Sequence, residues 1–112
     1  MIIIDLFSER QIENSIDLQC IGVYEFAWRY IFAVEIIKVL NDNNYIILGG
    51  DVYRIDDKNR RIFSTEDGWY FNKTNKNDVI ESCGKAITYI ENYYCKNGDH
   101  FCYSFVCELS KV

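Results

Sequence analysis

The fold is decided by residues 45–71, which read YIILGGDVYRIDDKNRRIFSTEDGWYF. We interpret this stretch as three strand segments in succession. Residues 45–48 are apolar on both faces, as a central buried strand should be. Gly49 and Gly50 interrupt the pattern, and a bulge or a close approach of two backbones is the expected cause.

The polar residues inside the stretch predict its turns. Residues 52–55 resume the alternation of a strand, and residues 56–59 supply the turn chemistry that reverses the chain. Residues 61–64 are the expected returning strand. Residues 65–68 predict a second turn, which leads into the aromatic run 69–71.

A helix is expected on the N-terminal side, over residues 24–41. Glu25 and Arg29 have the i,i+4 spacing of a helical ion pair. The polar run 41–44 stops the helix, because Asn and Asp favour caps and turns. The apolar residues that recur at three- and four-residue steps are Phe26, Ala27, Tyr30, Ala33, Val34, Ile37 and Leu40.

The same helix carries a second apolar strip, which a surface helix would not leave bare. Either the N-terminal segment covers the strip or another molecule does, for example a second copy in a homodimeric structural module. We favour internal cover, because residues 8–14 predict a short helical turn with Ser8 as cap and Gln11 three residues on. The strip consists of Trp28, Phe32, Ile36 and Val39.

The C-terminal part predicts a loop over residues 72–77, a helix over 78–95 and a last strand. Asp78 and Glu81 have capping-box spacing, and Gly98 suits the left-handed position after a helix. The buried helix face is expected to hold Val79, Ile80, Cys83, Ala86, Ile87, Ile90, Tyr93 and Tyr94. The last strand alternates, with Phe101, Tyr103, Phe105, Cys107 and Leu109 on one side and Cys102, Ser104, Val106 and Glu108 on the other.

This order of elements predicts an α+β fold. We expect an antiparallel sheet of four to five strands with two main helices packed on one face. Residues 1–112 form a single domain in this prediction, since the chain is too short for two ordinary domains and contains no proline and no linker-like segment.

Composition bounds the possible functions. A net charge of −5 disfavours nucleic-acid binding, which depends on Lys and Arg, and suits a basic protein partner instead. Simple solubility explains the charge equally well. The N-terminus lacks the pattern of a signal peptide, and no run is long enough to span a membrane. We therefore expect a cytoplasmic protein.

No metal or cofactor is expected. Five cysteines cannot all pair, and reduced cysteines used as small hydrophobes fit a cytoplasmic chain. The spacing of Cys95, His100 and Cys102 matches no familiar zinc pattern. Asp51, Asp56 and Asp57 could be imagined as a calcium site, but they lack the alternating ligands of a calcium loop.

Asp51 has two readings. It either accepts backbone N–H bonds beside the glycine step, which we favour, or points outward as a recognition carboxylate. The glycine step itself lacks the lysine and the helix that a phosphate loop requires. An enzyme is not expected, but a small-ligand or hydrolytic site in a pocket near Asp51 and His100 is the main alternative class.

Trp69 and Tyr70 follow two acidic residues, and Trp and Tyr are the commonest anchors of protein interfaces. Alternation along a strand buries only one of two neighbours on a given face. We therefore expect at least one of these two rings to be accessible.

Two pieces of the sequence carry a family resemblance. The segment ILGGDVY at residues 47–53 is followed by DGWY at residues 67–70, and then by a helix with Ala86, Tyr89, Ile90 and Tyr93. In this order and spacing, from Gly22 to Leu109, the chain resembles the immunity protein 40 family. Members of that family are small α+β proteins encoded beside polymorphic or contact-dependent bacterial toxins.

The resemblance implies neutralisation without catalysis. Such a protein binds a cognate toxin domain and blocks its active site or a neighbouring surface, as a monomer or a weak homodimer. From composition and placement we expect the partner-binding face to consist of Asp51, Tyr53, Asp56, Asp57, Glu66, Asp67, Trp69 and Tyr70.

Overall fold

The computed structural model describes residues 4–23 and 25–111. The helices are α1 (Glu9–Glu13), α2 (Tyr30–Asp42) and α3 (Asp78–Asn97), with short 3-10 turns η1 (Ile4–Leu6) and η2 (Leu18–Ile21). The strands are β1 (Ile16–Asp17), β2 (Phe26–Arg29), β3 (Tyr45–Asp56), β4 (Arg61–Tyr70), β5 (Phe101–Ser104) and β6 (Val106–Leu109).

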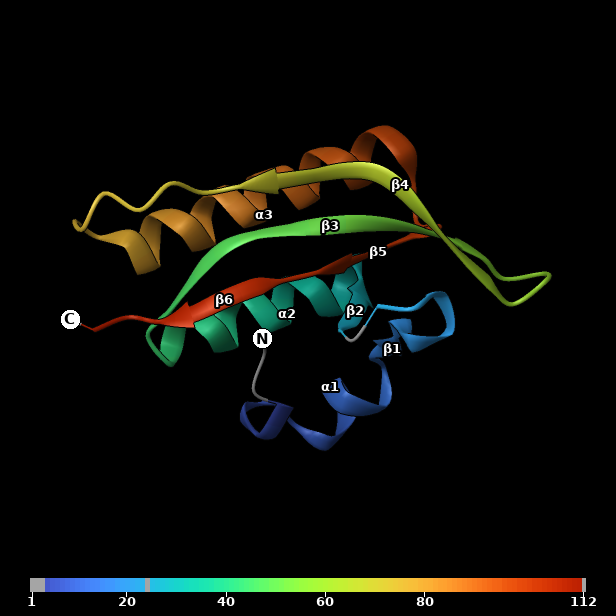
Figure 1. Cartoon of the computed structure of the whole chain (residues 1–112), viewed down its shortest axis with the longest axis horizontal. Helices are drawn as coiled ribbons and strands as arrows, with labels where there is room; N and C mark the ends of the chain where they lie inside the picture. The colour runs from blue at the N-terminus through green and yellow to red at the C-terminus, as the bar shows by residue number, and fades with distance from the viewer. Residues whose placement is uncertain (1–3, 24, 112) are drawn as a thin grey trace.

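The strands form one antiparallel sheet in the order β1-β2-β5-β3-β4, and β6 also pairs with β3. Both long helices lie behind this sheet in Figure 1. The α+β class and the placement of two main helices on one face are confirmed. The sheet has six strands, more than the predicted four to five, because β1 and β2 were not recognised and the last strand divides at Phe105.

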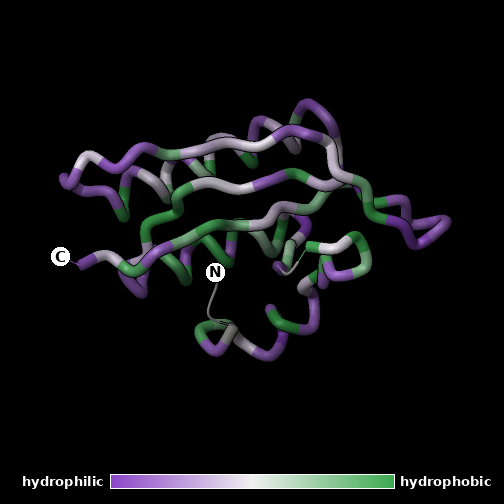
Figure 2. The backbone as a smooth tube through the Cα atoms, viewed as in Figure 1, coloured by the Kyte–Doolittle hydropathy of each residue, from purple (hydrophilic) through white to green (hydrophobic). Residues whose placement is uncertain are grey.

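β3 is the spine of the sheet. It pairs with β6 over its first half, with β5 over its second half and with β4 along most of its length. Gly49 and Gly50 do not end the strand. The segments predicted within residues 45–71 therefore form two long strands, β3 and β4, joined by one hairpin. Figure 2 shows that this hairpin is hydrophilic at its tip.

Gly50 is required by close packing. A Cβ atom at this position would collide with the Ser104 carbonyl oxygen and with the indole ring of Trp69. The glycine therefore lets the Trp69 ring lie directly against the backbone of β3. The predicted close approach is confirmed, and register shifts on both sides of this step show the irregularity that accompanies it.

The main core lies between the sheet and the two helices. α2 contributes Ala33, Ile36, Ile37 and Leu40, and α3 contributes Cys83, Ala86 and Ile90. A smaller core lies on the opposite face of the sheet, where η2 covers part of it; its buried members are Leu18, Ala27, Tyr53 and Cys102. The alternation predicted for the last strand is confirmed in its central part, since Tyr103, Phe105 and Cys107 join the main core and Cys102 joins the smaller one.

The predicted start of the first long helix is wrong. Phe26–Arg29 form β2, which pairs with β1 and β5, and the helix begins only at Tyr30. Tertiary pairing overrides the helical spacing here, and Arg29 in the N-cap position makes no side-chain capping bond that would mark the boundary. The proposed Glu25–Arg29 ion pair does not form, because in a strand these residues are not helical neighbours.

The apolar strip is covered from within, as we favoured. Trp28 and Ile36 are fully buried, and Phe32 and Val39 pack against the main core. Phe7 meets the Trp28 ring edge-on at 5.4 Å. Of this strip, only Phe32 and Val39 remain partly exposed.

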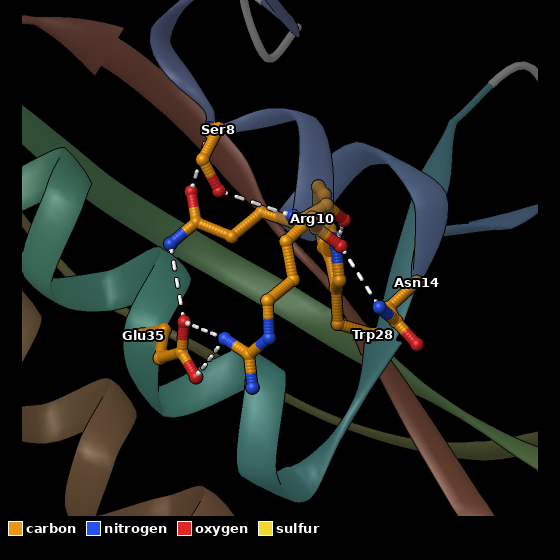
Figure 3. A network of polar contacts seen from close by, with 6 residues as sticks. Ser8, Arg10, Asn14, Trp28 and Glu35 are labelled. Atoms are coloured by element: carbon orange, nitrogen blue, oxygen red, sulfur yellow. Dashed lines mark hydrogen bonds and ion pairs between the residues drawn. The ribbon is translucent and has the colours of Figure 1, made fainter.

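Polar contacts hold the N-terminal segment in place (Figure 3). The Trp28 indole donates to the carbonyl oxygen of Gln11 at 2.8 Å, and Arg10 pairs with Glu35 of α2 at 3.3 Å. The predicted cap is confirmed, because Ser8 and Gln11 form a reciprocal capping box.

The helix capping prediction at Asp78 is wrong in its detail. Asn77 is the N-cap residue, and the Asp78 carboxylate instead accepts from the backbone N–H groups of Thr74 and Asn75, both at 2.9 Å. Asp78 thus organises the loop before α3. Gly98 ends the helix with a positive φ of +86°, but its ψ of −164° lies outside the predicted left-handed helical conformation. Within residues 4–23 and 25–111, no helix has the length and apolar character needed to cross a bilayer.

Candidate binding surface

A bulge in β4 replaces the predicted second turn. Asp51 pairs with Gly68 and Tyr53 pairs with Ser64, so Val52 alone faces residues 65–67. Such an insertion bends the edge strand and redirects its side chains. Sequence composition could not separate the two outcomes, because Thr, Glu, Asp and Gly suit a turn as well as a bulge.

Thr65 fixes the shape of this bulge. Its hydroxyl donates to the Val52 carbonyl oxygen at 2.7 Å and accepts the backbone N–H of Asp67 at 3.0 Å. Glu66 adopts φ +65°, a left-handed conformation that is uncommon outside glycine. Both Glu66 and Asp67 are exposed as a result.

The two aromatic residues after the bulge point in opposite directions. Trp69 is 8% exposed and stacks on Tyr89 of α3 at 5.0 Å. Tyr70 is 68% exposed, with the Lys85 ammonium 5.2 Å from its ring centre. The expectation that one of the two rings is accessible is confirmed.

Asp67 is tied to α3. The Tyr93 hydroxyl donates to its carboxylate at 2.9 Å, and Tyr89 and Tyr93 have their ring centres 6.0 Å apart. Burial and the Asp67 carboxylate raise the pKa of Tyr93 to about 12. The Tyr93 hydroxyl therefore remains a proton donor to Asp67 at neutral pH.

Asp51 lies on the face of the sheet opposite the long helices. The residue across from it on β4 is Gly68, where an added Cβ would lie 3.2 Å from Oδ1 of Asp51. Asp51 is exposed and accepts no hydrogen bond from residues 4–23 or 25–111. The favoured structural role is therefore wrong, because the carboxylate does not accept backbone N–H groups as that role required.

Glu25 lies near Asp51, a proximity that the sequence did not predict. Burial and the nearby Asp51 carboxylate raise the pKa of Glu25. Burial, Asp51 and Glu25 raise the pKa of Tyr53, whose side chain is only 6% exposed. No local signal in the sequence joins residues 25 and 51, because their proximity comes from the sheet order β2-β5-β3.

The carboxylates at the hairpin tip are held by internal partners. Asp56 accepts the backbone and side-chain N–H groups of Asn59 at 3.2 and 2.9 Å, which lowers its pKa. Asp57 pairs with Arg29 at 2.5 Å and with His100 at 3.5 Å. The bond from Arg29 is the main reason that the pKa of Asp57 is also lowered.

The pocket proposed near Asp51 and His100 does not form between those residues. A shallow hollow of about 560 Å³ is lined by His100, Asp57, Asn97 and neighbouring residues, and Asp51 is not among them. Ile55 bonds to the His100 carbonyl, so Asp51 lies four residues farther along β3, roughly 13 Å away. The two side chains therefore do not converge on one reacting atom.

The cysteines are all free thiols. Cys83, Cys102 and Cys107 are buried, and burial raises their pKa values to about 11, 12 and 12, respectively. Cys95 and His100 are exposed whereas Cys102 is not, and the described part of the chain contains no group of three candidate metal ligands.

The comparison with known families agrees with this architecture. The family model of Immunity protein 40 matches residues 17–107, which include the whole sheet except the first residue of β1 and the end of β6, as well as both long helices. The chain belongs to the Immunity protein 40 family. No curated protein and no solved structure matches it.

The structure shows why the two pieces of the immunity-protein motif occur together. Gly50 from the first piece and Trp69 from the second are directly paired across β3 and β4, and the indole ring occupies the space that a side chain at residue 50 would need. Tyr89 from the helix then stacks on the same ring. The motif is therefore one packing unit beneath the bulge.

Proposed function

We propose that this immunity protein binds the toxin domain encoded beside its own gene and inhibits it by blockade, in the cytoplasm and as a monomer. Membership of the Immunity protein 40 family supports the general role. The surface that best suits such binding is the exposed part of the β4 bulge and its neighbours, which we call the bulge surface: Asp51, Glu66, Asp67 and Tyr70.

The observation that carries this proposal is the accessibility of three carboxylates and one large aromatic ring on two adjacent strands. None of these carboxylates has a Lys or Arg partner within 4.0 Å among residues 4–23 and 25–111. Unpaired acidic groups steer a basic protein during diffusion, and an exposed tyrosine supplies the apolar contact that then holds it.

Internal contacts support the bulge surface. Thr65 bonds both sides of the bulge, Trp69 is packed beneath it, and Tyr93 holds Asp67 from α3. A preorganised surface loses little conformational entropy on binding, which favours affinity. The surface therefore suits recognition of a folded partner without rearrangement.

The other residues of the expected face have different roles in this proposal. Tyr53 and Trp69 are buried and support the surface from beneath. Asp56 and Asp57 lie at the hairpin tip, where their charges are bonded to neighbours. We place these two outside the main contact.

The test is the stoichiometry of inhibition. The toxin domain from the adjacent gene is purified, its activity is measured, and this protein is added in increasing amounts. Blockade predicts that inhibition rises linearly and is complete near one protein per toxin. Complete and lasting inactivation by a small fraction of an equivalent would mean that the protein modifies the toxin catalytically, and absence of any inhibition at excess would overturn the proposal.

A further inference from the structure

Ser104 is a buried polar residue in the middle of the sheet without a hydrogen-bond partner. Its side chain is 0% exposed, and its hydroxyl oxygen is bonded to no residue of the described chain. Ser104 lies on β5, and its partner across the sheet on β2 is the small residue Ala27. Such an orphaned group is unusual, because nearly all buried polar atoms are bonded.

Two carboxylates flank this hydroxyl. Asp51 is its neighbour on β3, one residue before the Val52–Tyr103 pair, and Glu25 lies just before Phe26 and Ala27 of β2. Glu25 and Tyr53 both lie near enough to Ser104 for its hydroxyl to lower their pKa values, although burial raises each of them overall. The hydroxyl therefore lies beside Glu25 and Tyr53, and Asp51 occupies the adjacent position on β3.

Neither Glu25 nor Asp51 forms an ion pair with a Lys, Arg or His side chain of the described residues. The cations of the described ion pairs are used elsewhere, with Arg29 on Asp57, Lys73 on Glu108 and Arg10 on Glu35. The partly buried Glu25 carboxylate, with a like charge and an unbonded hydroxyl beside it, destabilises the free protein. A single added cation with several N–H donors would relieve all three groups at once.

We propose that Glu25, Asp51 and Ser104 form a cation site that accepts one arginine side chain of the toxin. The guanidinium group suits these acceptors because its planar fork of five N–H donors reaches two carboxylates and a hydroxyl together. Tyr53 forms part of the apolar wall and places its hydroxyl beside the same groups. The identity of the partner as a toxin domain rests on the proposed function. The affinity of the site for an arginine side chain does not.

The chemistry is tested without the toxin. The ¹⁵N-labelled protein is titrated with N-acetyl-arginine methylamide, and with the citrulline analogue as a neutral control of the same shape. Binding predicts shifts of the backbone amides around Ser104, Asp51 and Glu25 with arginine and none with citrulline. Equal shifts with both compounds, or arginine shifts confined to the hairpin tip, would overturn the site.

Matched variants locate the effect. Glu25→Gln, Asp51→Asn and Ser104→Ala should each weaken arginine binding at least about fivefold, since the first two remove a negative charge and the third removes the hydroxyl acceptor. Glu13→Gln removes an exposed carboxylate from α1 and should change nothing. The amide spectrum of each variant shows whether it is folded, and unchanged binding by a folded Glu25→Gln and a folded Asp51→Asn would rule the site out.

The toxin complex separates this inference from the proposed function. Glu25→Gln should weaken the complex roughly 30-fold or more, as expected when one partner of a buried charged contact is removed. If Glu25→Gln binds the toxin normally whereas a Glu66→Lys/Asp67→Lys variant does not, the cation site is wrong and the proposed function stands. If the toxin is not bound at all, the proposed function fails and the arginine titration still decides the site.

Discussion

The hairpin tip and the bulge surface both carry acidic residues, at two places along the β3–β4 pair. The carboxylates at the tip have internal bonding partners, whereas most of those at the bulge have none. At the tip, Asp56 is bonded to Asn59, and Asp57 to Arg29 and His100. At the bulge, Asp51 and Glu66 face solvent without a cation beside them. The difference arises from neighbours that are distant in sequence, since 28 residues separate Arg29 from Asp57.

This comparison separates charge in a sequence from charge that a partner can use. A carboxylate already paired inside the protein must give up that pairing, or share it, before it can bind a basic partner. An unpaired carboxylate loses only its hydration. The two ends of the hairpin should therefore respond differently to substitution, in stability as well as in binding.

The largest expected effect is on the support beneath the bulge. Trp69→Ala should lower the free energy of unfolding by about 3–5 kcal/mol, because it leaves a cavity between Gly50 and Tyr89. The neighbouring Tyr70→Ala should change it by no more than about 0.5 kcal/mol, since that ring is exposed. Urea unfolding of both variants measures the contrast, and equal losses would show that the burial of these two rings is misassigned.

The next effect concerns association with the toxin. Glu66→Lys/Asp67→Lys should slow association about tenfold at low ionic strength, because steering depends on accessible charge. Asp56→Lys/Asp57→Lys changes the net charge equally at the tip and should slow it less. Stopped-flow mixing measures both rates, and a larger effect at the tip would reverse the assignment of the two regions.

A smaller effect is expected on the pH dependence of stability at the tip. The lowered pKa of Asp57 means that its ionised form stabilises the fold above its ordinary pKa, and that this stabilisation is lost as the pH falls through the lowered value. Asp57→Asn should therefore reduce the melting temperature at pH 7, and the difference should shrink below about pH 4. Thermal melts from pH 2 to pH 8 test this, and a constant difference would remove the ion pair as its cause.

The smallest effect has the opposite sign. The raised pKa of Glu25 means that the folded protein binds its proton more tightly than the unfolded chain, so stability falls as the pH rises through the raised value. Glu25→Gln should therefore raise the melting temperature at pH 7 slightly, by no more than about 2–4 °C, since solvent screens a carboxylate that is only partly buried. The gain should vanish below about pH 4, and a loss of stability at pH 7 would show that Glu25 is already paired in the free protein.

The sequence predicted the elements whose signals are local. The capping box at Ser8, the helix ending before Gly98 and the alternation around Tyr103 depend on residues a few positions apart, and all three are present. The boundary between β2 and α2 was missed, because Phe26 and Trp28 fit a helical spacing as well as a strand and Arg29 gives no capping signal.

The candidate site was predicted only in part for the same reason. Carboxylates and aromatic rings were visible in the sequence, but their availability depends on long-range partners. The sequence predicted an ion pair between Glu25 and Arg29, but in the structure Arg29 pairs with Asp57. Ser104 carried no signal, because only the sheet order makes it an orphaned hydroxyl beside two acids.

Amide hydrogen exchange tests the central claim most directly, with the protein measured free and in complex with the toxin domain of the neighbouring gene. If the bulge surface is the contact, exchange slows in the peptides that contain residues 64–71 and in those that contain Asp51, while the hairpin tip at residues 57–60 is unchanged. Slowed exchange at the tip or on α1, with none at the bulge, would contradict the account.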